Sequence, residues 1–314
     1  MNNQVLSSKR SAVDSWTGAA GIGGMIAATI LAAATSLWKV LLIGWVGFAA
    51  MMGGAVLGAR AARRPAEAVH PRRLAWAYGL SSGAMIMSAC LFLVPTATAH
   101  DARLGGIGIA LGLTAGFALH LFGHGGRSRS DRAQGTRSGS RDQGRGEHPD
   151  ASVPPVVGAL LLHAVAAGLV IGGVYAAMPS MGATLGLSIV SHKAPAGYVA
   201  ARRLTRQGKS IVLLVLPAAA VGIAAVPVGL VDPPSAESAY GLAFGLATGA
   251  FLHVAIDFLP QCDWGSELYR AAQSDGKERA DAPSTTGCPR EMRRDAVVST
   301  VAGGLLVVGA WFVL

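Results

Sequence analysis

Long apolar runs separated by short polar links dominate this chain. Each run has about the ~20 residues that a membrane-spanning helix needs. The predicted spans are 16–37, 40–59, 74–95, 104–122, 154–177, 182–204, 210–230, 239–260 and 296–314. The pattern therefore predicts an all-α integral membrane protein, a helical bundle of about nine transmembrane helices.

The polar segments set the organisation of the chain. One segment, 123–153, is rich in Gly, Ser and Arg and has almost no large apolar residues. Such a segment buries too little apolar surface to fold, so we predict a disordered cytoplasmic loop. The expected parts are a cytoplasmic N-terminal tail at 1–15, four helices in 16–122, this loop, four helices in 154–260, a cytoplasmic loop at 261–294 and a last helix at 295–314.

The composition agrees with a membrane protein. Hydrophobic residues make up 52% of the chain and charged residues only 14%, whereas roughly 25% charged residues is usual in soluble domains. Many of the 42 glycines lie inside the apolar runs, where small residues let helices pack closely in lipid. The sequence lacks a phosphate-binding G-x-x-x-x-G-K-[ST] loop and a catalytic Ser or Cys arrangement. We therefore expect no direct use of ATP and no enzyme activity.

The net charge of +9 comes from arginines that cluster in loops rather than within spans. This distribution indicates membrane lipid as a partner, not nucleic acid. The basic loops 60–73, 123–152, 202–209 and 261–294 alternate with links 96–103, 178–181 and 232–237, which are poor in Lys and Arg. The positive-inside rule then predicts a multi-pass protein of the cell membrane with its N-terminus in the cytoplasm and its C-terminus outside.

Two pairs of spans resemble each other internally. Residues 83–95 and 249–260 both begin with Gly-Ala, carry an alanine further on, and end in Phe-Leu followed closely by proline. The stretches around His163 and His192 share the pattern His-x-x-x-Ala-Gly. By the predicted orientation the members of each pair cross in opposite directions. Inverted repeats of this kind are common in secondary transporters, whose binding sites lie near the middle of the membrane.

His163 and His192 are predicted to lie in the middle of two apolar helices, each with an alanine four residues later. An ionisable residue at mid-membrane depth marks a functional site by default. His253 also falls inside a span, and Asp257 lies near the cytoplasmic end of the same span. Packing against a neighbouring helix is the simpler interpretation of His253. Asp257 could be an exit-side ligand or form an ion pair with a loop arginine.

These stretches resemble the motifs of the Zrt/Irt-like (ZIP) family of divalent metal transporters. The run from His163 to Gly168 is similar to the family's His-Asn-x-x-Glu/Asp-Gly helix, and His192–Gly197 is similar to its His-x-x-Pro-Glu-Gly helix. Residues 82–95 resemble the helix with Gly-x-Met and a proline exit, and 257–260 resemble the helix that ends in an acidic-Leu-Pro run. The resemblance covers spans two to nine. It implies an eight-helix core with one extra N-terminal helix.

The resemblance implies a transported metal ion, zinc or a related transition-metal cation, moved by alternating access through a mid-membrane site. Carried over by position, the metal ligands are His163, His192 and Met85. Lys193, His253 and Asp257 are other possible pathway residues. No resident cofactor is expected, and a homodimer is possible.

The chain departs from the family where the family has its other polar ligands: Ala164, Ala167 and Ala196 replace an asparagine and two carboxylates. Two imidazoles and a thioether leave a dication without a compensating charge, which is costly in a low-dielectric site. The site could still bind a divalent ion weakly, or it could favour a softer ion such as Cu⁺. The alternative is a degenerate ZIP-fold protein without metal transport that has a structural or sensory role.

Overall fold

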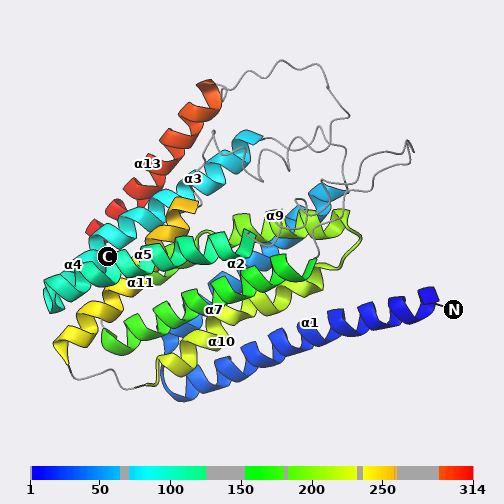
Figure 1. Ribbon diagram of the computed structural model, residues 1–314, viewed down its shortest axis with the longest axis horizontal. Helices are drawn as coiled ribbons and strands as arrows, with labels where there is room; N and C mark the ends of the chain where they lie inside the picture. The colour runs from blue at the N-terminus through cyan, green and yellow to red at the C-terminus, as the bar shows by residue number, and fades with distance from the viewer. Residues whose placement is uncertain are drawn as a thin grey trace, which may run out of the picture.

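The structure is a computed structural model. It describes residues 2–63, 71–124, 153–179, 183–231, 236–257, 259 and 290–313. Within these ranges every regular element is a helix. The helices lie roughly along one axis and form an elongated bundle, with the N-terminus and C-terminus toward opposite ends (Figure 1).

The first half of the chain contributes six helical elements, of which three join end to end. A tight turn at Ser36, whose φ is +62°, connects the first two helices. A π-helical segment, η2, continues α3 directly into α4, so these three elements form one long rod. The elements are α1 (Asn2–Ala34), α2 (Trp38–Ala62), α3 (Pro71–Ser88), η2 (Ala89–Leu93), α4 (Val94–His100) and α5 (Ala102–His124).

The second half contains a broken rod, α8 and α9, and a short 3₁₀ turn, η3, that leads into α10. The elements are α7 (Val153–Ala177), α8 (Ala183–Val190), α9 (Lys193–Arg206), η3 (Ile211–Leu214), α10 (Val215–Val228), α11 (Glu237–Asp257) and α13 (Arg290–Val313). The all-α prediction is confirmed for the described residues.

Seven helical segments in these ranges are long and apolar enough to cross a membrane. They are Ser15–Ala34, Trp38–Ala62, Ala75–His100, Val157–Ala177, Ile211–Val228, Glu237–Ile256 and Arg293–Val313. The chain is therefore a multi-pass membrane protein. Two further predicted spans look different in the structure: α5 has a shorter apolar part, Ala102–Ala118, and the expected helix 182–204 is divided into α8 and α9.

Glycines set how closely the helices approach. The main helix pairs are α3 with α13, α5 with α11, α2 with α9, and α7 with α10. In each pair a Cβ on an interface glycine would meet backbone atoms of the partner helix. Examples are Gly83 against Thr300, Gly249 against Ile109, Gly54 against Ala194, and Gly172 against Ala225. Such close contact gives van der Waals attraction, which replaces the hydrophobic effect as the force that holds helices together in lipid.

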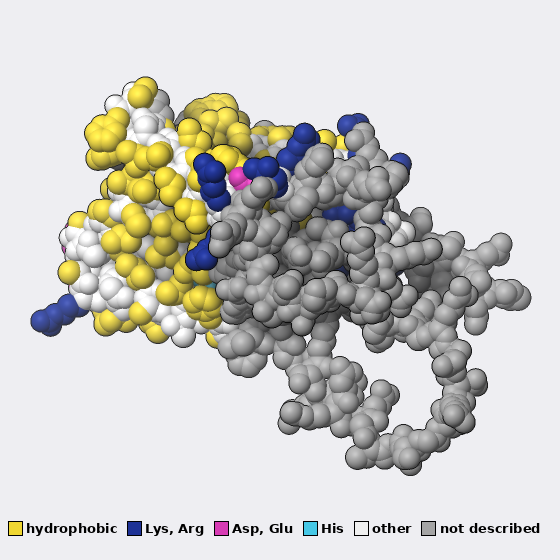
Figure 2. Space-filling model, turned by 90° about the horizontal axis from the view of Figure 1, so that it is seen from above, with side chains coloured by type: hydrophobic (Ala, Val, Ile, Leu, Met, Phe, Trp, Pro, Cys, Tyr) yellow, Lys and Arg dark blue, Asp and Glu magenta, His cyan; other side chains and the backbone are white. Residues whose placement is uncertain are grey.

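The surface of the bundle is apolar. Leu306, Phe312 and Trp16 are 67%, 77% and 76% exposed, and hydrophobic side chains cover much of the surface that Figure 2 shows. Most of the visible Lys and Arg side chains gather where this apolar surface meets residues that are not described (Figure 2). An apolar belt with charges at its border is what a lipid-embedded bundle requires.

Several predicted boundaries change. The helix α1 begins at Asn2, inside the segment expected to be a tail, and α13 begins at Arg290, inside the expected 261–294 loop. His192 was predicted to lie in mid-helix, and this is wrong: it lies in the turn between α8 and α9. The predicted disordered loop 123–153 lies almost entirely outside the described residues, because α5 ends at His124 and α7 begins at Val153.

Candidate metal site

His163 and His192 meet inside the bundle. The Nε2 atom of His163, in the middle of α7, lies 3.0 Å from Nε2 of His192, and the pair is separated by 29 residues in the chain. The two rings meet edge to face, with centroids 5.1 Å apart and planes at 79°. His192 is only 1% exposed. At this distance one imidazole donates its N–H to the ring nitrogen of the other, which requires opposite roles at the two Nε2 atoms.

The break between α8 and α9 follows from Pro195. Proline has no N–H, so it cannot donate to the carbonyl of Ser191 four residues earlier. Instead, the hydroxyl of Ser81 on α3 donates to that carbonyl at 3.2 Å. On the other side of the break, the N–H and hydroxyl of Ser191 both bond to the carbonyl of Ser188, at 3.2 and 2.7 Å. Polar side chains thus satisfy the backbone where the ladder is interrupted, as a broken helix in a membrane requires.

Met85 completes the set of three residues that the sequence predicts as ligands. It is fully buried on α3 and lines the same cavity as His163 and His192. This cavity has a volume of about 50 Å³, and Ala167, Phe251 and Val254 also line it. Because one water needs only ~10–15 Å³ by this kind of measure, the space could hold a small ion or a few waters. The structure therefore brings the three predicted ligands together from three different rods.

The geometry is close to that of a two-histidine metal site. With metal–nitrogen bonds of ~2.0–2.1 Å and a tetrahedral angle, two coordinating nitrogens lie ~3.3 Å apart. The observed separation of 3.0 Å is a few tenths of an ångström shorter. A small opening of the two rings, with the proton of the donating imidazole moved from its Nε2 to its Nδ1, would leave both Nε2 atoms able to coordinate a metal ion.

Charge is what this site lacks. Within the described ranges, no three His, Cys, Asp or Glu side chains come together as a metal-binding group. Three alanines stand where the ZIP motifs have polar ligands: Ala167 lines the cavity, Ala164 is fully buried and Ala196 is partly buried. The donors that remain are two imidazoles and a thioether, a neutral and rather soft ligand set.

Lys193 and His253, two of the other predicted pathway residues, do not line this cavity. Lys193 is the first residue of α9 and is 3% exposed. His253 packs edge to face against Phe117 of α5, with ring centroids 4.5 Å apart, and its ring would collide with a Cβ placed on Gly116. This contact agrees with the helix-packing interpretation of His253. Asp257 is the last residue of α11, and its side chain lies outside the described residues.

Two polar clusters near the helix ends were not anticipated. At one, His100 at the end of α4 pairs with Glu237 and stacks on Tyr240 and Phe244, with centroid distances of 5.0 and 5.8 Å. Local sequence patterns could not reveal this contact, because His100 and Glu237 are 137 residues apart.

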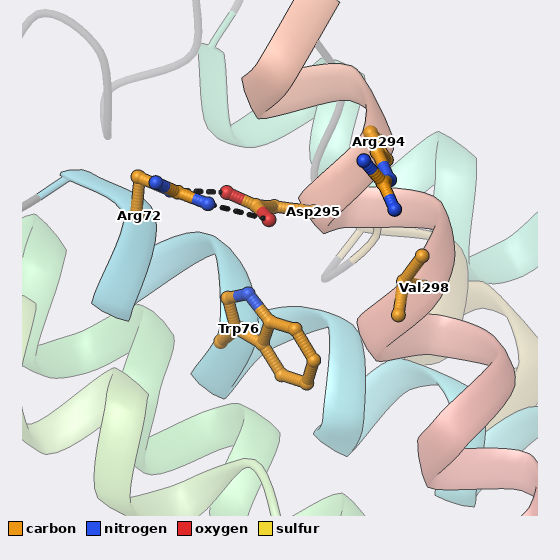
Figure 3. Close-up of a pocket in the computed structure, with 5 residues that line it drawn as sticks. All are labelled: Arg72, Trp76, Arg294, Asp295 and Val298. Carbon is orange, nitrogen blue, oxygen red and sulfur yellow. Dashed lines mark hydrogen bonds and ion pairs between the residues drawn. The ribbon is translucent and has the colours of Figure 1, made fainter.

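The second cluster joins the N-terminal parts of α3 and α13, within the first two turns of each helix. Arg72 forms a two-point ion pair with Asp295, with Nε–Oδ2 and Nη2–Oδ1 distances of 2.6 and 3.2 Å. Figure 3 shows this pair facing a pocket that Trp76, Arg294 and Val298 also line. The pocket has a volume of about 380 Å³. From sequence alone these arginines indicated only the orientation of the chain in the membrane.

Comparisons with known proteins identify no family for this chain. No protein-family model matches the sequence, and no curated protein matches it either. The resemblance to the ZIP motifs therefore depends on the residues themselves and on how the fold arranges them.

Proposed function

We propose that this protein is a ZIP-like metal-ion transporter that moves a transition-metal cation through the His163–His192–Met85 cavity. The observation that carries the proposal is the meeting of the two histidine rings, 3.0 Å apart, beside a buried methionine. Each residue comes from a different rod, so relative movement of the rods changes the distances between the ligands. Such a site is suited to alternating access, in which one group of helices moves against another and opens the cavity to each side in turn.

The number of helical rods supports the proposed topology. The described residues form nine helical rods when α3, η2 and α4 are taken as one, α8 and α9 as one, and η3 and α10 as one. If each rod crosses the membrane once, the odd number puts the two termini on opposite sides, and Figure 1 shows the two ends of the chain toward opposite ends of the bundle. Combined with the basic loops, this supports an N-terminus in the cytoplasm and a C-terminus outside.

The packing supports an inverted repeat. The internal sequence similarity relates α3 to α11 and α7 to the α8–α9 rod. Continuing the same order along the chain relates α2 to α10 and α5 to α13. Under this exchange the pair α3–α13 becomes α11–α5, and the pair α2–α9 becomes α10–α7, and these four are the main helix pairs of the bundle. His163 and His192 then occupy related positions in the two halves.

The donor set favours a soft ion. Imidazole and thioether ligands suit Cu⁺ well, whereas Zn²⁺ usually also takes anionic ligands in such sites. A monovalent ion also costs less to place in a low-dielectric cavity that has no carboxylate. The proposed cargo is therefore a transition-metal cation, with Cu⁺ expected to be moved at least as well as Zn²⁺.

A second function is favoured by a specific observation. The 3.0 Å contact between the two imidazoles is a good hydrogen bond without any metal, and alanines occupy the positions of the family's polar ligands. If this hydrogen bond is the role of the two histidines, the protein is a ZIP-fold membrane protein without transport. The pair then joins α7 to the break between α8 and α9.

Flux measurements separate the two functions. The purified protein is placed in liposomes that contain a metal-sensitive dye, and uptake of Zn²⁺, Mn²⁺, Fe²⁺ and Cu⁺ is recorded. The transporter predicts saturable uptake of at least one ion, and a loss of about tenfold or more in the His163→Ala/His192→Ala double variant. His253→Ala is the matched control because it removes a buried imidazole outside the cavity lining. Absence of uptake for all four ions would reject the transport proposal and favour the second function.

A further inference from the structure

The pocket near the N-terminal ends of α3 and α13 is a candidate site for a lipid rather than for the transported ion. It is open, has a volume of about 380 Å³, and is lined by Arg72, Trp76, Arg294, Asp295 and Val298. We propose that it binds the phosphate headgroup of an anionic phospholipid, with one acyl chain lying along the outer face of α13. The proposal does not depend on the metal site.

The charge around the pocket favours an anion. Arg72, Arg73, Arg293 and Arg294 are all exposed at this end of the two helices. Asp295 is the acidic residue that lines the pocket, and its side chain is only 10% exposed, whereas that of Arg72 is 63% exposed. The carboxylate therefore holds one guanidinium in place, and the accessible wall remains positive. Guanidinium groups match phosphate oxygens in geometry as well as in charge.

Arg294 is the residue positioned to bind the phosphate. It lies on α13 next to Asp295, and its side chain also lines the pocket (Figure 3). The aspartate next to it in sequence is already engaged by Arg72 through two hydrogen bonds. The indole of Trp76 lies at the same level and is 36% exposed, which is typical of tryptophan at the boundary between headgroups and acyl chains.

An apolar strip begins where the pocket ends. Val298, Val301 and Leu305 follow Arg294 at intervals of four, seven and eleven residues, so they lie on the same face of α13. Their exposed fractions are 44%, 55% and 62%. A headgroup bound at Arg294 would therefore place an acyl chain on this strip. The combination of a basic pocket and a continuous apolar face is what distinguishes a phospholipid from a small soluble phosphate.

The test measures lipid binding to the full-length protein in neutral detergent by native mass spectrometry. The probes are dioleoylphosphatidylglycerol, dioleoylphosphatidylcholine, and glycerophosphoglycerol, which is the same anionic headgroup without acyl chains. The variants are Arg294→Gln and, as the matched control, Arg293→Gln, which removes the same charge from the neighbouring position that does not line the pocket. Both side chains are exposed, so neither change disturbs the core.

The anionic lipid should bind more tightly than the zwitterionic lipid. Arg294→Gln should weaken its binding about tenfold or more, because a charge-assisted hydrogen bond is lost. Arg293→Gln should weaken it at most about fivefold, which is the general attraction of one basic residue to an anionic surface. Equal losses in the two variants, or no preference for the anionic lipid, would overturn the proposal. Equally tight binding of glycerophosphoglycerol would overturn the lipid assignment and indicate a site for small phosphates.

Discussion

Replacing Gly54 by alanine should destabilise the protein, whereas the same change at its neighbour Gly53 should not. Both glycines lie on α2. A Cβ at Gly54 would collide with the carbonyl oxygen of Ala194 on α9, and it would lie 2.9 Å from the carbonyl carbon. A Cβ at Gly53 would have no atom within 4 Å. The two variants therefore differ in packing but share the same change in backbone entropy.

The magnitude follows from these distances. An ordinary contact of this kind is at least 3.4 Å long, and the carbonyl oxygen of Ala194 is the nearest atom, so α2 and α9 must separate by more than an ångström at Gly54. Overpacking of this kind costs about 1–3 kcal/mol, and the better helix propensity of alanine returns ~0.5–1 kcal/mol. Gly53→Ala has only the gain in helix propensity, because it causes no overpacking. The free energy of unfolding of the two variants should therefore differ by about 1–3 kcal/mol.

The measurement is reversible unfolding in mixed micelles of neutral detergent and SDS, followed by tryptophan fluorescence and far-ultraviolet circular dichroism. Gly54→Ala should unfold at a lower SDS fraction than wild type, and Gly53→Ala at the same or a higher fraction. Ala194 lies two residues beyond His192, so the displaced helix should also weaken metal binding at the cavity. If the two variants were equally stable, the close packing of α2 on α9 would not be what holds these helices together.

Two further changes test the cavity and the helix break. Ala167→Glu should add a carboxylate to the cavity that contains His163 and raise the affinity for Zn²⁺ about tenfold or more, because an anionic ligand compensates the charge of the dication. Titration calorimetry measures this affinity. An equal gain in the uncharged Ala167→Gln variant would contradict the reasoning. Ser81→Ala should lower the free energy of unfolding by about 1–3 kcal/mol, because it leaves the carbonyl of Ser191 at the break without its donor. Thr98→Ala is the control in the same unfolding assay, because its exposed hydroxyl bonds only to carbonyls of its own helix. Its free energy of unfolding should change by no more than ~0.5 kcal/mol. An effect equal to that of Ser81→Ala would count against a special role for the bond across the break.

The helices could largely be predicted from the sequence because long apolar runs have few alternatives in a membrane. A chain segment in lipid must satisfy its own backbone hydrogen bonds, so an apolar run of sufficient length becomes a helix. The histidines could be singled out for a related reason, since polar groups at that depth are costly. Their common location with Met85 was predicted only through the motif resemblance, and the structure brings the three side chains to one cavity.

The break at His192 could not be predicted from hydropathy. The run 182–204 reads as one span because hydropathy measures composition and not whether each carbonyl has a donor. Pro195 was the local signal, but proline within an apolar helix more often indicates a bend than two separate helices. The break depends on the hydroxyl of Ser81, which donates to the carbonyl of Ser191, 110 residues later in the chain. The Arg72–Asp295 pair was missed for the same reason, because its partners are 223 residues apart.

The π-helical segment Ala89–Leu93 has a consequence for how the length of this chain can vary. A π-type turn contains one residue more than the α-helical turn it replaces. Deleting one residue within it would therefore restore a regular turn and leave Met85 and His100 facing their present neighbours. The same deletion elsewhere in the rod would rotate everything beyond it by ~100° and turn His100 away from Tyr240 and Phe244. The rod thus contains a segment in which one residue can be deleted without changing how Met85 faces the cavity and how His100 faces Tyr240 and Phe244.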